Sequence, residues 1–128
     1  GNVQRVYDQY RAAHDIPSPA ELKAMREVYG LSAAKMSEIL GLGTNQYRLY
    51  EEGQMPSETI GKMLRSIQTP AVFLSYVEGC KKQMPEEEYT KLCKKIQKTF
   101  IQEIKRRPDL SWFREFLSFG GFARKVAL

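Results

Sequence analysis

The sequence predicts an all-α protein, in which a five-helix domain lies between an N-terminal helix and a C-terminal helical extension. Apolar residues recur three or four positions apart through most of the chain, as on one face of a helix. Glycine or proline separates each such segment from the next. The 128 residues are enough for one domain with a buried core, and 42% hydrophobic and 27% charged residues are typical of a globular protein.

The N-terminal segment, residues 1–17, is expected to be a short amphipathic helix followed by a linker. Its apolar positions are Val3, Val6, Tyr7 and Tyr10, spaced i, i+3, i+4 and i+7 before the break at Ile16-Pro17.

The five-helix domain is expected to span residues 18–79. Pro19 suits the first turn of its first helix, and Gly30 suits the left-handed residue that ends this helix. Ser32 is a favourable N-cap for the second helix, which Gly41 closes. A third helix is expected from about Thr44 to Glu51, with Tyr47 and Tyr50 buried. The fourth helix begins at Pro56-Ser57, and the fifth covers residues 71–77.

The C-terminal extension, residues 80–128, begins differently. Met84-Pro85 and three glutamates predict the start of a long helix, because acidic residues stabilise the positive end of the helix dipole. Pro108 is expected to end it. The aromatic residues between Trp112 and Phe122 are expected to pack on this helix, with a dimer interface as the alternative.

The second and third helices of the domain are separated by the glycine-rich turn Gly41-Leu42-Gly43. Two helices joined by a tight glycine turn indicate a helix-turn-helix motif, which places its second helix in the major groove of DNA. The N-terminal end of that helix meets the bases. The expected DNA-binding residues are Ser32, Lys35, Thr44, Asn45, Gln46, Arg48 and Leu49.

The chemistry of these side chains suits duplex DNA. Asn45 can pair bidentately with adenine and Arg48 with guanine, while Thr44 and Leu49 offer methyl contacts to thymine. Ser32 can present its hydroxyl and the helix N-terminus to a phosphate, with added charge from Lys35. A solvent-exposed helix face without a ligand is the alternative interpretation.

The segment from Leu22 to Leu64 resembles the Cro/repressor-type (XRE) helix-turn-helix family, with a lambda-repressor-like fold, on the residues GLGTNQYRLYEEG. It is most similar to the DNA-binding domain of MqsA-type antitoxins. The resemblance implies that Arg26 and Glu51 form a partly buried pair. Two positions depart from the family: Ala33 stands where many relatives have glutamine, and Leu49 where a base-reading arginine is expected.

The net charge of +5 lies outside the predicted DNA-binding segment. Residues 20–70 hold six basic and six acidic side chains, whereas residues 81–107 hold nine basic residues and four glutamates. The basic residues of segment 81–107 are expected to form a solvated lysine face or, alternatively, a second contact with the DNA backbone.

Other features indicate a cytoplasmic, non-enzymatic protein without cofactors. No apolar run approaches the roughly 18 residues of a membrane span, and no secretory signal is visible. Cys80 and Cys93 lack CxxC spacing, so free thiols are expected rather than a disulfide or metal site. His14 and the glutamates 86–88 form no catalytic motif. We expect Gly1 to remain from a removed tag, with further sequence upstream.

The sequence therefore predicts a dimeric, sequence-specific transcriptional regulator: a repressor or antitoxin-like autorepressor. Its expected partners are a second copy, a palindromic operator with half-sites about one helical turn apart, and a toxin or other protein bound through upstream sequence. The alternative is a helical protein-interaction module with weak or no DNA binding.

Overall fold

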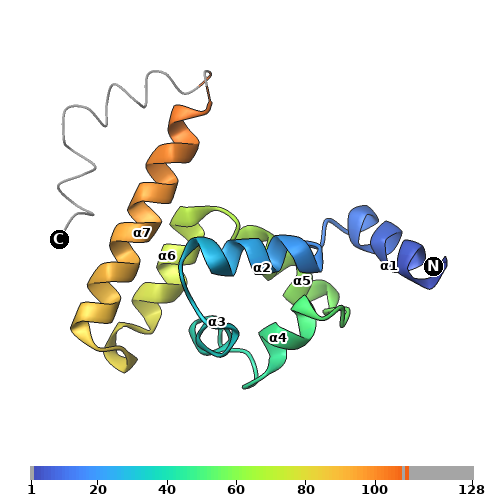
Figure 1. Cartoon of the computed structure of the whole chain (residues 1–128), viewed down its shortest axis with the longest axis horizontal. Helices are drawn as coiled ribbons and strands as arrows, with labels where there is room; N and C mark the ends of the chain where they lie inside the picture. Colours follow the sequence, from blue (N-terminus) through green and yellow to red (C-terminus); the bar gives the residue numbers. More distant parts are fainter. Residues whose placement is uncertain (1, 108, 110–128) are drawn as a thin grey trace. The chain divides into compact units, whose positions relative to one another are not determined.

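A computed structural model of the chain describes residues 2–107 and Asp109, and all of its regular structure in this part is helical (Figure 1). The all-α prediction is confirmed for these residues, among which no strand occurs. The helices are α1 (Asn2–Ala13), α2 (Pro19–Val28), α3 (Ala33–Leu40), α4 (Gln46–Glu51), α5 (Glu58–Ser66), α6 (Pro70–Gly79), the 3₁₀ helix η1 (Lys81–Gln83) and α7 (Glu86–Lys105).

Serine side chains begin three of these helices. Ser18, Ser32 and Ser57 each accept a hydrogen bond from the backbone amide three residues later, at 3.1, 3.1 and 3.2 Å. Each bond satisfies an amide that has no partner within its helix and stabilises the helix by about 1 kcal/mol. The starts of α2, α3 and α5 therefore follow from local sequence.

The predicted glycine at the end of α3 has the expected conformation. Gly41 is left-handed with a φ of 72°, and the Leu42 amide donates to the Ser37 carbonyl at 2.8 Å. Such a bond satisfies a carbonyl left open at the helix end. A side chain at Gly41 would be strained in this conformation.

The chain forms two compact units, of which the first contains residues 1–68. In this unit α4 packs against both α2 and α3. Figure 1 views α3 almost along its axis while α4 lies across the view, so the two helices are steeply inclined. The buried apolar side chains of the unit are Ile16, Leu22, Met25, Tyr29, Met36, Ile39, Leu40, Tyr47, Tyr50, Leu64 and Ile67.

A close contact joins the linker after α1 to α5. Gly61 is buried, and a Cβ atom there would lie 2.8 Å from Cγ1 of Ile16. Glycine therefore allows the Ile16 side chain, which is 4% exposed, to approach the α5 backbone.

The second unit begins at Thr69, and in it α6 packs along α7. The prediction from the sequence placed α6 in the five-helix domain of residues 18–79. In the structure, the division into compact units falls between Gln68 and Thr69, so that α6 belongs to the second unit. Cys80 and Cys93 are not joined by a disulfide; Cys93 is buried and Cys80 is half-buried. The expected packing of the aromatic segment 112–122 lies outside the described residues.

One helix boundary differs from the prediction, and one short helix was not predicted. The α-helix of α4 begins at Gln46 rather than at Thr44, because Thr44 and Asn45 form the turn in which the Gln46 amide donates to the Gly43 carbonyl at 2.9 Å. The structure also contains η1, which the sequence did not predict. Within the described ranges, no helix is both long and apolar enough to cross a membrane.

Candidate functional site

The N-terminal end of α4 is capped from a neighbouring helix. Ser37 lies within α3, is 1% exposed, and accepts a hydrogen bond from the Tyr47 amide at 3.0 Å. Asn45 occupies the N-cap position of α4 but its side chain makes no capping bond. Ser37 supplies an acceptor at the N-terminal end of α4, and the side-chain carboxamide of the exposed Asn45 makes no capping hydrogen bond there.

The side of α4 that faces the protein carries two tyrosines. Tyr47 is fully buried, and its hydroxyl donates to the Leu22 carbonyl at 2.6 Å. Burial raises the pKa of the Tyr47 phenol, because a phenolate would lose its hydration there. Tyr50 is 7% exposed. These two side chains determine which face of α4 remains in solvent, as the sequence predicted.

Arg26 connects three elements of the first unit. Its Nε donates to Glu51 Oε2 at 2.7 Å and its Nη2 donates to Glu51 Oε1 at 3.0 Å, so the pair is bidentate. The third nitrogen, Nη1, donates to the Leu31 carbonyl at 3.1 Å. The hydrogen bonds to Glu51 raise the pKa of the Arg26 guanidinium. This geometry confirms the predicted pair and links α2 to the end of α4 and to the residue before the α3 cap.

The solvent-facing side of α4 carries fewer of the candidate residues than expected. Thr44, Asn45 and Arg48 are exposed, and Arg48 Nη1 lies 3.0 Å from Glu52 Oε1. Leu49 is half-buried because it borders the side occupied by Tyr50. The exposed candidate surface is therefore Thr44, Asn45 and Arg48, hereafter the α4 face.

Gln46 has an unusual environment for a candidate base contact. Its side chain is half-buried, and its Nε2 is buried without a hydrogen-bond partner in the part of the chain described. A buried amide donor without a partner costs about 1–3 kcal/mol. The side-chain nitrogen Nε2 of Gln46 is therefore buried, whereas the neighbouring residue Asn45 is exposed to solvent.

The beginning of α3 contains the remaining two candidates. Ser32 is exposed and its Oγ accepts from the Lys35 amide, which leaves the hydroxyl hydrogen able to donate to an anion. Lys35 Nζ lies 3.4 Å from Glu38 Oε2, with 23% of the lysine side chain exposed. Lys35 is thus less accessible than its position on the helix suggested.

Sequence reasoning missed Ser37 and Glu52. A serine among the apolar positions of α3 could have indicated a buried polar role, because buried hydroxyls require a hydrogen-bond partner. Glu52 lies four residues after Arg48, which is a spacing that allows an ion pair on a helix surface. Neither residue was considered as part of the candidate site.

No group of three or more His, Cys, Asp or Glu residues is arranged to hold a metal ion among residues 2–107 and Asp109. His14 is exposed and its ring lies 4.2 Å from that of Tyr10, measured between centroids. Comparisons with protein-family models, with curated proteins and with solved structures find no match to this chain.

Proposed function

We propose that the protein binds double-stranded DNA sequence-specifically, with α4 in the major groove, and acts as a dimeric transcriptional regulator of the Cro/repressor type. The observation that carries the proposal is the α4 face, in which Asn45 is exposed and free of a capping bond while the opposite face is buried. An antitoxin-like autorepressor is the regulatory form that the resemblance to MqsA-type antitoxins suggests.

The α4 face offers the two side-chain types that read purines best. A carboxamide can donate to and accept from the adenine edge, and a guanidinium can donate twice to guanine. Asn45, at the N-cap, and Arg48 are three positions apart, and both are exposed at the N-terminal half of α4. Each bidentate contact contributes about 1–3 kcal/mol of discrimination between bases.

Rigid positioning supports the same proposal. The Arg26–Glu51 pair holds the C-terminal end of α4, and Ser37 holds its N-terminal end. Base recognition requires that side chains meet the groove in one orientation, and a six-residue helix would not hold that orientation alone. Ser32 at the start of α3 would then donate to a backbone phosphate.

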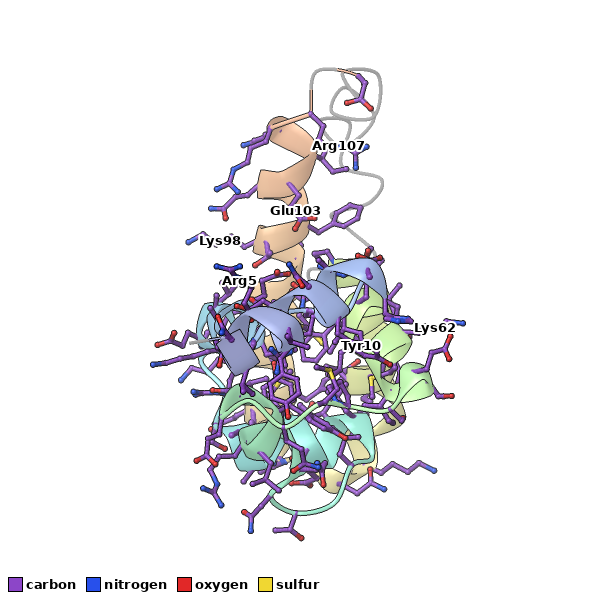
Figure 2. All side chains as sticks on the ribbon, turned by 90° about the vertical axis from the view of Figure 1, so that its right-hand side faces the viewer. Arg5, Tyr10, Lys62, Lys98, Glu103 and Arg107 are labelled. Carbon is purple, nitrogen blue, oxygen red and sulfur yellow. The ribbon has the colours of Figure 1, made fainter. Side chains whose placement is uncertain are left out.

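A helical protein-interaction module is the second candidate, and the distribution of charge favours it. Residues 20–70 have equal numbers of basic and acidic side chains, and both Arg48 and Lys35 lie beside glutamates. The basic excess is instead on residues 81–107, where Lys98 points away from α7 (Figure 2). In this second candidate, the α7 lysines bind an acidic protein partner.

Selection from a pool of random DNA duplexes tests the first proposal. The full chain is expected to enrich a short palindromic sequence, and Asn45→Ala and Arg48→Ala are each expected to weaken binding to it by roughly 10-fold, which corresponds to about 1.4 kcal/mol. Lys62→Ala is the matched control, since Lys62 forms an exposed i,i+4 pair with Glu58 at 3.8 Å on α5.

The outcomes separate the two candidates. If no duplex is enriched, or if Asn45→Ala and Arg48→Ala bind as Lys62→Ala does, the α4 face does not read DNA. Loss of binding in both α4 variants with the control unchanged supports major-groove recognition. Binding of all duplexes without enrichment, lost when the lysines of α7 are replaced, would indicate a nonspecific backbone contact and reject the role of α4.

A further inference from the structure

Helix α1 has the reverse of the usual surface pattern. The buried residue of this helix is Arg11, at 3% exposure, whereas its apolar side chains Val3, Val6, Tyr7 and Tyr10 are 66%, 58%, 47% and 44% exposed. These four residues, hereafter the α1 stripe, lie on one face because of their i, i+3, i+4 and i+7 spacing. The sequence predicted the stripe, and the structure leaves it uncovered by the described residues.

The C-terminal turn of α1 fixes the direction in which the stripe faces. Arg11 Nη2 donates to the Gly53 carbonyl at 2.8 Å, and its Nη1 lies 3.4 Å from Asp8 Oδ1. The Ile16 amide donates to the Arg11 carbonyl at 2.8 Å, which continues the attachment into the buried Ile16. Arg11 is about a quarter-turn away from the stripe around the helix, so anchoring this arginine leaves the stripe in solvent.

An exposed apolar stripe on a short helix is a candidate interaction surface. A helix of twelve residues is only marginally stable in water without packing. The largest contiguous apolar patch on a protein surface is often a functional one. Arg5 and Tyr10 project to different sides of α1 (Figure 2), so the charged and apolar faces are separate.

We propose that the α1 stripe packs against the α1 stripe of a second copy of this chain, with the two helices antiparallel. A two-fold axis passing between Val6 and Tyr7 places Val3 opposite the Tyr10 of the other copy. It places Val6 at the level of the other copy's Tyr7 and beside its Val6. Each level of the interface therefore contains one valine and one tyrosine, which is the self-complementarity that a symmetric interface requires. The antiparallel arrangement also opposes the two helix dipoles favourably.

The electrostatics of the surroundings are compatible with a second copy. The stripe itself contains no charged residue, and the side chains next to it on one flank are the uncharged Asn2 and Gln9. On the other flank Arg11 is already bound to Gly53 and to Asp8. Pairing thus brings no unpaired like charges together, whereas an acidic or basic peptide would find no charged partner on the stripe.

The size of the stripe predicts how strong this contact is. Two half-exposed tyrosines and two more exposed valines present on the order of 400 Å² per copy. A stable interface buries about 800 Å² per partner. The proposed contact is therefore weak and concentration-dependent in solution. Its biological use rests on the proposed DNA-binding function, because two copies held on adjacent half-sites would be brought together by the DNA.

Sedimentation equilibrium of the full chain without DNA tests the proposal. The average mass is expected to rise from monomer towards dimer over a range from about 10 µM to about 1 mM. Val6→Glu places a carboxylate in the centre of the interface and is expected to lower the association constant at least about 10-fold. The matched control is Arg5→Glu, which introduces the same residue one position away on the opposite face and is expected to change it less than about 2-fold.

Cysteine cross-linking tests the geometry, in a Cys80→Ser background because Cys80 is half-buried while Cys93 is buried. Val6→Cys is expected to cross-link to its own copy readily under mild oxidation. Val3→Cys is expected to cross-link poorly with itself and more efficiently with Tyr10→Cys in a mixture of the two chains. Equal yields from all single variants and from the mixture would reject the antiparallel register.

The result that would overturn the inference is a chain that is monomeric throughout this range, or a dimer that Val6→Glu leaves unchanged. In the latter case the second copy binds at another surface. Both results are distinct from failure of the proposed function, because a half-site duplex measures DNA binding by the monomer. Retained half-site binding with no α1 dimer would reject only the inference made here from α1.

Discussion

Replacing Glu51 with alanine is expected to destabilise the first unit by about 2 kcal/mol. The carboxylate accepts two charge-assisted hydrogen bonds from Arg26, at 2.7 and 3.0 Å, and the two side chains are 21% and 11% exposed. A fully buried pair broken in this way would cost about 3–5 kcal/mol, and a solvent-exposed pair less than about 1 kcal/mol. Partial exposure of Arg26 places the value between these limits.

The chain contains a matched control at the next position. Glu52 is also at the end of α4 and also pairs with an arginine, but its side chain is 56% exposed and that of Arg48 is 53% exposed. Glu52→Ala is therefore expected to cost less than about 0.5 kcal/mol. Urea denaturation followed by circular dichroism measures both, and thermal melts should show a decrease of roughly 8–16 °C for Glu51→Ala.

A double substitution separates the pair from the rest of the structure. Arg26→Met with Glu51→Leu removes both charges and keeps side-chain volume, so it is expected to be less destabilising than the sum of Arg26→Met and Glu51→Leu alone. Equal effects of Glu51→Ala and Glu52→Ala would refute the reasoning. So would additive single substitutions, since they would mean that the bidentate geometry contributes nothing.

Three further predictions concern packing, pH and charge. Gly61→Ala is expected to destabilise the chain by about 1–3 kcal/mol in urea denaturation. Gly79→Ala is the control and should have no measurable effect, because a Cβ there meets no atom within 4 Å. Equal effects of the two substitutions would contradict the close contact between Gly61 and Ile16. Because burial raises the pKa of Tyr47, the native chain keeps the phenol proton at a pH at which the unfolded chain loses it. The free energy of unfolding is therefore unaffected by this group below the ordinary phenol pKa of about 10 and falls above it. Tyr47→Phe should cost about 1 kcal/mol at neutral pH and show a shallower loss of stability at alkaline pH, and an unchanged alkaline profile would exclude this cause. Glu52→Gln releases Arg48 from its ion pair and removes a negative charge, so DNA affinity in low-salt titrations should rise a few-fold; weaker binding would mean that Glu52 positions Arg48.

Helix ends were the most predictable feature because they depend on residues only a few positions apart. The serine caps Ser32 and Ser57 and the left-handed Gly41 act through bonds within one turn, so the starts of α3 and α5 and the end of α3 could be predicted from local sequence. The apolar spacing likewise placed Tyr47 and Tyr50 in the core. The Arg26–Glu51 pair followed from the family resemblance rather than from periodicity.

Features that depend on tertiary contacts could not be obtained in this way. The bond from the Tyr47 amide to Ser37 joins α4 to a different helix, and it supplies an acceptor at the end of α4 where the Asn45 side chain makes no capping bond. The half-burial of Leu49 and Gln46 depends on how α4 packs, which helical spacing alone does not determine. Periodicity also identifies an apolar face without saying what covers it, which is why the exposure of the α1 stripe was not foreseen.

The location of the charges connects the proposed function with the proposed α1 interface. A DNA-binding surface gains much of its affinity from lysine and arginine side chains at phosphates, each of which releases a counterion. Residues 20–70 carry six basic and six acidic side chains, and Arg48 and Lys35 lie close to glutamates, so one copy would neutralise few phosphates. Its binding should then be weak and have a shallow dependence on salt. Two copies joined through α1 would bind one operator with an affinity that neither reaches alone, because the second contact becomes intramolecular. Val6→Glu should therefore weaken binding to a full palindrome and leave binding to a half-site unchanged.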